Sequence, residues 1–182
     1  MPETGRHRAA RAAYRARVGD DGPDLERTAD GRYVVVDGRR WRASDPGIPD
    51  RLRAELVAEL MTARRLVRTE GDAARHRVHD AKVALGERGE PWWEEASGEG
   101  RSERVLATAR ALLRHRPDGT TCPSEVARVV GGEGWRSLTP RVRALVHGLP
   151  ADGALRVLQR GEPVGPGAQG PVRIGRGPSF PD

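Results

Sequence analysis

His79, Asp80 and Lys82 carry the side-chain types that general acid–base chemistry uses. On a helix, His79 and Lys82 share a face while Asp80 points elsewhere, so the spacing does not bring the three groups together. No second carboxylate or histidine lies at metal-ligand spacing from them, and no nucleophile stands out. An enzyme would need a pocket that gathers His79, Lys82 and carboxylates. The pattern instead predicts a solvated face or a cap over nearby tryptophans, with no enzymatic activity, metal or cofactor.

Cys122 is the only cysteine, which excludes a disulfide framework and a cysteine-based zinc site. Its position at the expected start of a helix could activate the thiol, although a small buried cap is the more common role of such a residue. The run Gly131-Gly132-Glu133-Gly134 lacks the following lysine and the preceding strand of a phosphate-binding loop. Neither motif predicts nucleophilic or nucleotide chemistry.

The charge of the chain is concentrated in its second half. Residues 101–182 contain 13 Arg against 7 Asp and Glu, a net charge of +6, whereas residues 1–100 contain 19 basic and 19 acidic residues. Of the 32 basic residues 31 are Arg, a bias that is typical of GC-rich genomes. The placement of the charge is therefore better evidence than its amount, and it favours a nucleic-acid-binding module.

The elements expected over residues 101–177 are three helices followed by a hairpin. The first helix has apolar residues at helical spacing and ends at Pro117-Asp118-Gly119. A short second helix begins near Pro123 and stops at Gly131-Gly132. A third helix is expected over 135–149, then a strand over 154–159, a wing loop over 160–170 and a returning strand over 171–176. This order predicts a winged helix-turn-helix.

The third helix would be the one that enters the major groove. Its apolar positions, from Leu138 to Leu149, form one side. Arg136, Arg143 and His147 then cluster on the opposite side, with Arg141 at its edge. Because proline is tolerated only in the first turn of a helix, Pro140 limits how early the regular helix can begin.

The predicted nucleic-acid site combines this helix face with the wing and with the start of the second helix. Arg136 and Arg143 would reach base edges, wing arginines would follow the backbone or minor groove, and hydroxyls at the second helix would hold a phosphate. The set comprises Arg136, Arg141, Arg143, His147, Arg156, Arg160, Arg173, Arg176, Thr121 and Ser124. The partner expected is double-stranded DNA, and transcriptional regulation is one role of such proteins. Winged helices also serve as protein-interaction modules, in which the arginines would merely solubilise the surface.

The first half is expected to hold a basic tail and a smaller module. Residues 1–29 predict a basic tail that is disordered or at most weakly helical, because its run of Arg and Ala lacks an apolar stripe and stops at Gly19-Asp20-Asp21-Gly22-Pro23. The alternative is a basic arm that adds nonspecific phosphate contacts. Residues 30–93 predict a β-hairpin with an Asp37-Gly38 turn, followed by two helices that form an αα-hairpin. The first helix follows the turn 45–50, carries an apolar stripe over 52–67 and is broken at 69–72, and the second runs over 73–85. Residues 94–100 would be a linker and 178–182 a C-terminal tail. The expected fold class is mainly α with small antiparallel β elements.

Trp92 and Trp93 stand side by side after the expected αα-hairpin. One interpretation is a lid over the ends of the two helices, which a small core needs. The other is a stacking surface for a base or for a partner protein, although neighbouring glutamates would repel phosphate. The alternative function is thus a protein-interaction adaptor that uses the αα-hairpin and this tryptophan pair without touching nucleic acid.

The sequence has no apolar run of roughly 20 residues that could span a bilayer. Its N-terminus lacks the hydrophobic segment of a signal peptide. A cytoplasmic protein without a membrane partner is expected, and the oligomeric state stays open.

Several runs in the second half also resemble a bacterial domain family of unknown function whose predicted structure is winged-helix-like. The resembling runs are 120–128, Gly134-Trp135-Arg136, 157–161 and 170–174. Upstream, the runs 37–42 and 79–89 resemble a segment that often precedes this domain in actinobacterial hypothetical proteins. The resemblance implies the fold and the source but no established activity. One departure is Gly148-Leu149-Pro150, where such proteins continue the third helix, and it predicts a shorter helix here.

Overall fold

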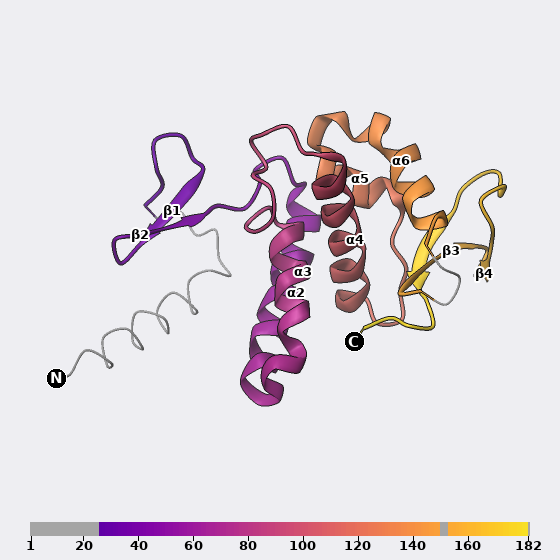
Figure 1. Cartoon of the computed structure of the whole chain (residues 1–182), viewed down its shortest axis with the longest axis horizontal. Helices are drawn as coiled ribbons and strands as arrows, with labels where there is room; N and C mark the ends of the chain where they lie inside the picture. Colours follow the sequence, from indigo (N-terminus) through magenta and orange to yellow (C-terminus); the bar gives the residue numbers. More distant parts are fainter. Residues whose placement is uncertain (1–25, 150–152, 182) are drawn as a thin grey trace. The chain divides into compact units, whose positions relative to one another are not determined.

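The computed structural model of the protein describes residues 26–149 and 153–181. These residues form helices and two small antiparallel sheets (Figure 1), so the predicted fold class is confirmed. The described residues divide into two compact units, one that ends at Ser44 and one that begins at Asp45. Helices from both sides of residue 100 lie in the second unit.

The first unit contains the predicted β-hairpin. β1 (Tyr33–Val36) pairs antiparallel with β2 (Arg39–Arg42) across a two-residue turn. Asp37 and Gly38 both have positive φ, 52° and 74°, as a turn that matches the twist of the strands requires.

Part of the predicted tail joins this hairpin. Arg27 bridges to Val34, and the amide of Val35 donates to the carbonyl of Glu26 at 2.8 Å. Order therefore begins before the predicted start at Asp30. Residues 1–25 of the predicted tail lie outside the described residues.

The second unit begins with the two expected helices, which pack against each other. α2 (Asp50–Glu70) and α3 (Arg75–Ala84) are joined by the 3₁₀ turn Gly71–Ala74. The predicted apolar stripe of α2 is buried, from Leu52 to Ala63. This stripe packs with residues of α3, α4 and α5 in one hydrophobic cluster.

α4 (Gly98–His115) is the central helix of this unit (Figure 1). Ser97 caps it by accepting the amide of Gly100 at 3.0 Å, so the helix begins within the predicted linker 94–100. Its residues contribute to two hydrophobic clusters, one shared with α2 and α3 and one shared with the C-terminal elements. The helix is consequently covered on two sides, and Leu112 and Leu113 are both fully buried.

α5 (Pro123–Gly131) and α6 (Trp135–His147) follow, joined by the 3₁₀ turn Gly132–Gly134. α6 ends two residues before the predicted end, in agreement with the shorter helix that Gly148 suggested. The expectation about Pro140 is wrong, because the helix starts five residues before it. The ring is exposed, and the hydroxyl of Thr139 donates to the carbonyl of Trp135 at 3.0 Å near the interrupted backbone ladder.

A three-stranded antiparallel sheet completes the unit, with the order β4-β3-β5. The strands are β3 (Leu155–Gln159), β4 (Glu162–Pro163) and β5 (Arg173–Arg176). β3 and β5 are the two predicted strands, whereas β4 lies in the expected loop and pairs with β3 across a tight turn.

The segments on either side of the sheet also contact it. Thr121, just before α5, forms an antiparallel bridge to Ile174 of β5. The predicted tail 178–182 is described up to residue 181, and there Phe180 packs against the core cluster.

Candidate nucleic-acid interface

The C-terminal elements carry most of the unpaired positive charge of their unit. Described residues after Glu125 include eight arginines but only two acidic residues, Glu133 and Glu162. Five of these arginines are exposed and form neither an ion pair nor a hydrogen bond with a described residue. They are Arg128 on α5, Arg136 and Arg141 on α6, Arg156 on β3 and Arg160 in the turn after it.

The outward face of α6 differs from the predicted one by part of a turn. Arg136 and Arg141 are exposed, together with the small residues Ser137, Pro140 and Ala144. Arg141, predicted at the edge, therefore lies on the exposed face. Arg143 and His147, predicted beside Arg136, are half-buried.

The side chain of Arg143 binds the loop between β4 and β5. Its guanidinium donates to the carbonyl of Gly170 at 3.1 Å and also to the carbonyl of Ala168. Both donors belong to one planar group, so the contact fixes the loop on α6. Arg143 is thus placed as a support for the loop.

His147 lies one turn further along α6. Its Nε2 atom is buried and has no hydrogen-bond partner among the described residues. Burial, together with the positive charge of Arg143, lowers the pKa of His147 below its ordinary value. The imidazole is accordingly neutral at neutral pH.

The sheet presents Arg156 and Arg173 on one face. The register pairs Arg156 with Gly175 and Leu158 with Arg173, which places both arginines on the same side. Arg173 is exposed but held by Thr120, to whose hydroxyl and carbonyl it donates at 2.8 and 3.0 Å.

Arg176, at the end of β5, is directed to α4 and the C-terminal segment. It donates to the carbonyl of Leu113 at 3.1 Å, and its guanidinium lies 4.7 Å from the ring centroid of Phe180. The predicted basic surface of the sheet region therefore consists of Arg156, Arg160 and Arg173, while Arg176 fastens the C-terminal segment.

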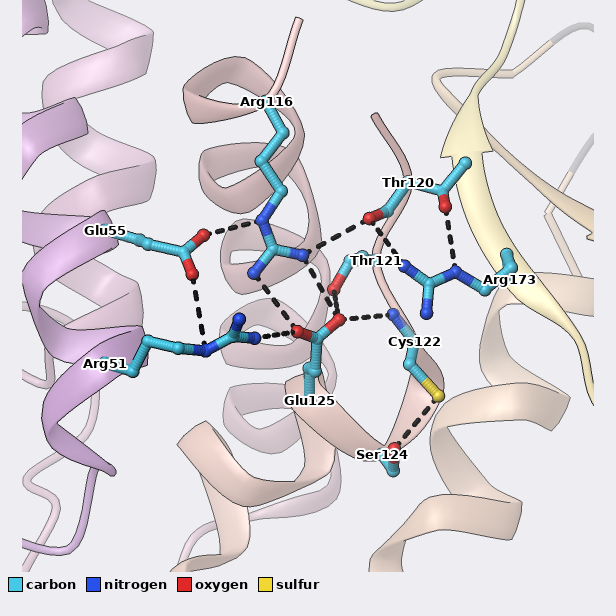
Figure 2. A network of polar contacts seen from close by, with 9 residues as sticks. All are labelled: Arg51, Glu55, Arg116, Thr120, Thr121, Cys122, Ser124, Glu125 and Arg173. Atoms are coloured by element: carbon cyan, nitrogen blue, oxygen red, sulfur yellow. Dashed lines mark hydrogen bonds and ion pairs between the residues drawn. The ribbon is translucent and has the colours of Figure 1, made fainter. Parts of the chain in front are cut away.

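Thr121 and Ser124, predicted to hold a phosphate, have partners inside the protein (Figure 2). Thr121 is fully buried and donates to the carboxylate of Glu125 at 3.2 Å. Ser124 donates to Sγ of Cys122 at 2.9 Å. The Glu125 carboxylate also accepts the amide of Cys122 at 2.9 Å, so a side chain of the protein already supplies the negative charge that this helix end favours.

Figure 2 shows that Glu125 also belongs to an ion-pair network across three helices. It pairs with Arg116 at 3.1 Å and with Arg51 of α2 at 2.6 Å, and Arg116 pairs with Glu55 of α2 at 2.6 Å. Burial alone would raise the pKa of Glu125, but hydrogen bonds from Arg116 and the amide of Cys122 hold it below its ordinary value. This network fastens α2, the end of α4 and the start of α5 together.

The side chains first considered for acid–base chemistry go to separate partners. Asp80 is buried and binds Arg110 at 2.6 Å and Arg114 at 2.7 Å. Burial raises the pKa of Asp80, but these two guanidinium groups lower it by more. His79 lies 3.3 Å from Glu103, and Lys82 lies 2.9 Å from Glu87.

Trp92 and Trp93 contact each other edge to face, with ring centroids 5.1 Å apart and planes at 86°. Both are half-buried. A Cβ atom on Gly86, which has φ 79°, would lie 3.0 Å from Trp92, so this ring covers the end of α3. Trp92 also lines a cleft of about 390 Å³ between the segment 88–96, α4 and the start of α6.

Sequence reasoning missed one pair of residues at the interface, Arg128 and Trp135. The guanidinium carbon of Arg128 lies 4.3 Å from the ring centroid of Trp135, and that of Arg136 lies 4.7 Å from the same centroid. The sequence did hold a signal for Arg128, because this residue lies on the polar side of a helix whose other side is apolar. Its contact with Trp135 joins two elements and has no sequence spacing to reveal it.

Residues 102–177, from α4 through β5, match the model of a family described as "Protein of unknown function (DUF3253)". The match includes every residue of the predicted nucleic-acid site and supports an uncharacterised domain in this region. No curated protein and no solved structure matches the chain. Across residues 26–149 and 153–181, none of the helices has the length and apolar character needed to cross a membrane.

Proposed function

We propose that residues 101–177 form a winged helix-turn-helix that binds double-stranded DNA. In this proposal α5 and α6 are the two helices of the helix-turn-helix, and β3, β4 and β5 with their loops form the wing. α6 would enter the major groove, as the second helix of such a motif does. The wing would contact the neighbouring backbone.

The observation that carries the proposal is a group of five exposed arginines on α5, α6, β3 and the β3–β4 turn that form no ion pair or hydrogen bond with a described residue. A guanidinium already bound to a carboxylate must break that pair before it can bind a phosphate. A free one only displaces water and releases the counterions of the DNA, which is the main source of nonspecific affinity. The described residues of this region include only two acidic side chains, Glu133 and Glu162, against eight arginines.

The contacts of the individual side chains refine their roles. Arg141, on the exposed face of α6 among small residues, is the proposed reader of base edges, with guanine as the preferred base for its fork of donors. Arg156, Arg160 and Arg173 contact phosphates from the wing. Arg143 supports the wing loop, and neither Arg143 nor the half-buried His147 contacts DNA.

Fluorescence anisotropy of the full chain with a labelled duplex tests the proposal at 50 and 200 mM salt. Each phosphate contact contributes about 0.9 to the magnitude of the slope of log affinity against log salt, so Arg156→Ala/Arg160→Ala, which removes two of the proposed phosphate contacts, reduces that magnitude by roughly 1.8. The matched control is Arg65→Ala/Arg68→Ala, which removes two exposed arginines from α2 and leaves the slope unchanged. A wild-type chain that does not bind duplex at 50 mM salt would overturn the proposal.

The second candidate is a protein-interaction adaptor, and the cleft lined by Trp92 favours it. A partner would insert an apolar side chain against Trp92 there, and Trp93 would support that ring. A pull-down that survives nuclease treatment and high salt, and that Trp92→Ala abolishes, would favour the adaptor over DNA binding. Because Trp92 covers the end of α3, thermal unfolding of that variant is the necessary control.

A further inference from the structure

Two arginines from different helices share one indole ring at the corner between α5 and α6. Arg128 comes from α5 and Arg136 from α6, and both guanidinium carbons lie within 4.7 Å of the ring centroid of Trp135. Trp135 is half-buried and packs against the hydrophobic core cluster of α4, α5, α6 and the sheet. The ring is therefore a fixed platform for two exposed cations.

This arrangement orients the two guanidinium groups without using their N–H donors. Stacking on an indole is a cation–π contact, which leaves the in-plane fork of donors free for an anion. Glu125 and Glu133 each lie three residues before one of these arginines. Glu125 is bound to Arg51 and Arg116, and Glu133 is exposed and makes no ion pair with either Arg128 or Arg136. Two cations near one ring also repel each other, so an anion that contacts both lowers the energy of the pair.

We propose that Arg128, Trp135 and Arg136 form a binding site for one backbone phosphate of DNA. The inference rests on the proposed function and deepens it by naming the ligand group. Arg136 then positions the helix and does not read a base, and Arg128 becomes a further positioning residue. Arg141 lies five residues beyond Arg136, about 7.5 Å further along the axis of α6. At that position it can reach the major groove while Arg136, in the first turn of α6, binds the DNA backbone.

The test compares Arg128→Ala with Arg141→Ala in the full chain, on a set of duplexes that differ at single base pairs. A phosphate contact carries no sequence information, so Arg128→Ala weakens binding to every duplex by the same factor and lowers the salt slope by about 0.9. Arg141→Ala changes the ranking of the duplexes. Arg128→Lys keeps the charge but loses the planar stack, and we expect several-fold weaker binding at an unchanged salt slope.

The outcomes separate this inference from the proposed function. A wild-type chain that binds no duplex overturns both. A wild-type chain that binds, together with an Arg128→Ala variant of unchanged affinity or of altered duplex ranking, overturns the phosphate site alone. Wild-type affinity in Arg128→Lys overturns the role of the indole platform. Arg128 is exposed, so denaturant unfolding of the variants should match the wild type and confirm that lost affinity is not lost folding.

Discussion

The unit from Asp45 onward uses arginine in two different ways. Between α2, α3, α4 and the start of α5, five buried or half-buried arginines are bound to carboxylates from another helix or loop. The pairs are Arg77 with Glu59, Arg104 with Asp45, Arg110 and Arg114 with Asp80, and Arg116 with Glu55 and Glu125. On α6 and the β3 side of the sheet, arginines are exposed or bound only to carbonyls and hydroxyls. The same residue type thus joins helices in one region and stays available to an anion in the other.

Burial explains the difference between the two regions. A charge that leaves water is tolerated only when an opposite charge and hydrogen bonds replace the solvent. The side chain of Arg114 is 1% exposed and therefore requires Asp80, whereas Arg136 and Arg141 keep their hydration and require nothing. Two results would contradict this distinction: substitution of a paired arginine that leaves the free energy of unfolding unchanged, or substitution of an exposed, unpaired arginine that lowers it.

The largest expected effect is that of Asp80→Ala. This variant leaves the guanidinium of Arg114 buried without its carboxylate, and we expect the free energy of unfolding to fall by about 3–5 kcal/mol. Denaturant unfolding measures it. Asp72→Ala is the matched control, because the pair of Asp72 with Arg75 is exposed and contributes at most about 1 kcal/mol. An equal effect of the two variants would contradict the distinction between the regions.

A second set of variants removes arginine side chains from each of the two regions. Arg104 is half-buried and binds Asp45 and the carbonyls of Ala84 and Val129, so Arg104→Ala should cost about 1–3 kcal/mol. Arg141→Ala and Arg156→Ala remove exposed side chains that form no ion pair or hydrogen bond with a described residue, and each should change the unfolding free energy by less than about 0.5 kcal/mol. Denaturant unfolding of the three variants at one salt concentration gives the ranking. A large loss in either exposed variant would show that the free arginines stabilise the fold.

Hydrophobic spacing predicted the helices well because each helix buries an apolar stripe. It did not predict which charges pair. On α4 the apolar residues indicated one buried face, and Arg110 and Arg114 lay off it. The structure covers that side as well, with α3 and Asp80. A helix pattern shows that a residue is polar, but only the tertiary arrangement shows whether a carboxylate lies opposite it.

The sequence predicted the exposed arginines of the candidate site but not the contacts of its other residues. The exposure of Arg136, Arg141, Arg156, Arg160 and Arg173 agrees with the expected basic surface. The contacts of Arg143 were not predictable, because a long glycine- and proline-rich loop has no periodicity to show where it packs. The shared ring of Trp135 joins residues of two helices across a turn and was missed for a related reason.

Arg143→Ala should have a local effect. It removes the hydrogen bonds to the carbonyls of Ala168 and Gly170, at a cost of about 1 kcal/mol, and loosens the loop between β4 and β5. Hydrogen exchange of the amides in 164–172 should become faster while that of α4 stays unchanged. Arg141→Ala, on the same helix, is the control and leaves the loop protected. Unchanged exchange in Arg143→Ala would show that the loop is held by other contacts.

The smallest effect concerns the protonation of His147, one turn beyond Arg143 on α6. The pKa of His147 is lowered in the folded protein, so the folded state binds this proton less readily than the unfolded chain does. The corresponding stability is fully present above the ordinary pKa of about 6.5 and is lost as the pH falls below it. Thermal unfolding of the wild type and of His147→Gln should therefore differ by a constant amount between pH 7.5 and 8.5. Below pH 6.5 the wild type should lose stability relative to the variant. The loss should shrink in the Arg143→Ala background, which removes one of the two causes of the shift, and a wild type that gains relative stability on acidification would contradict the buried, neutral imidazole.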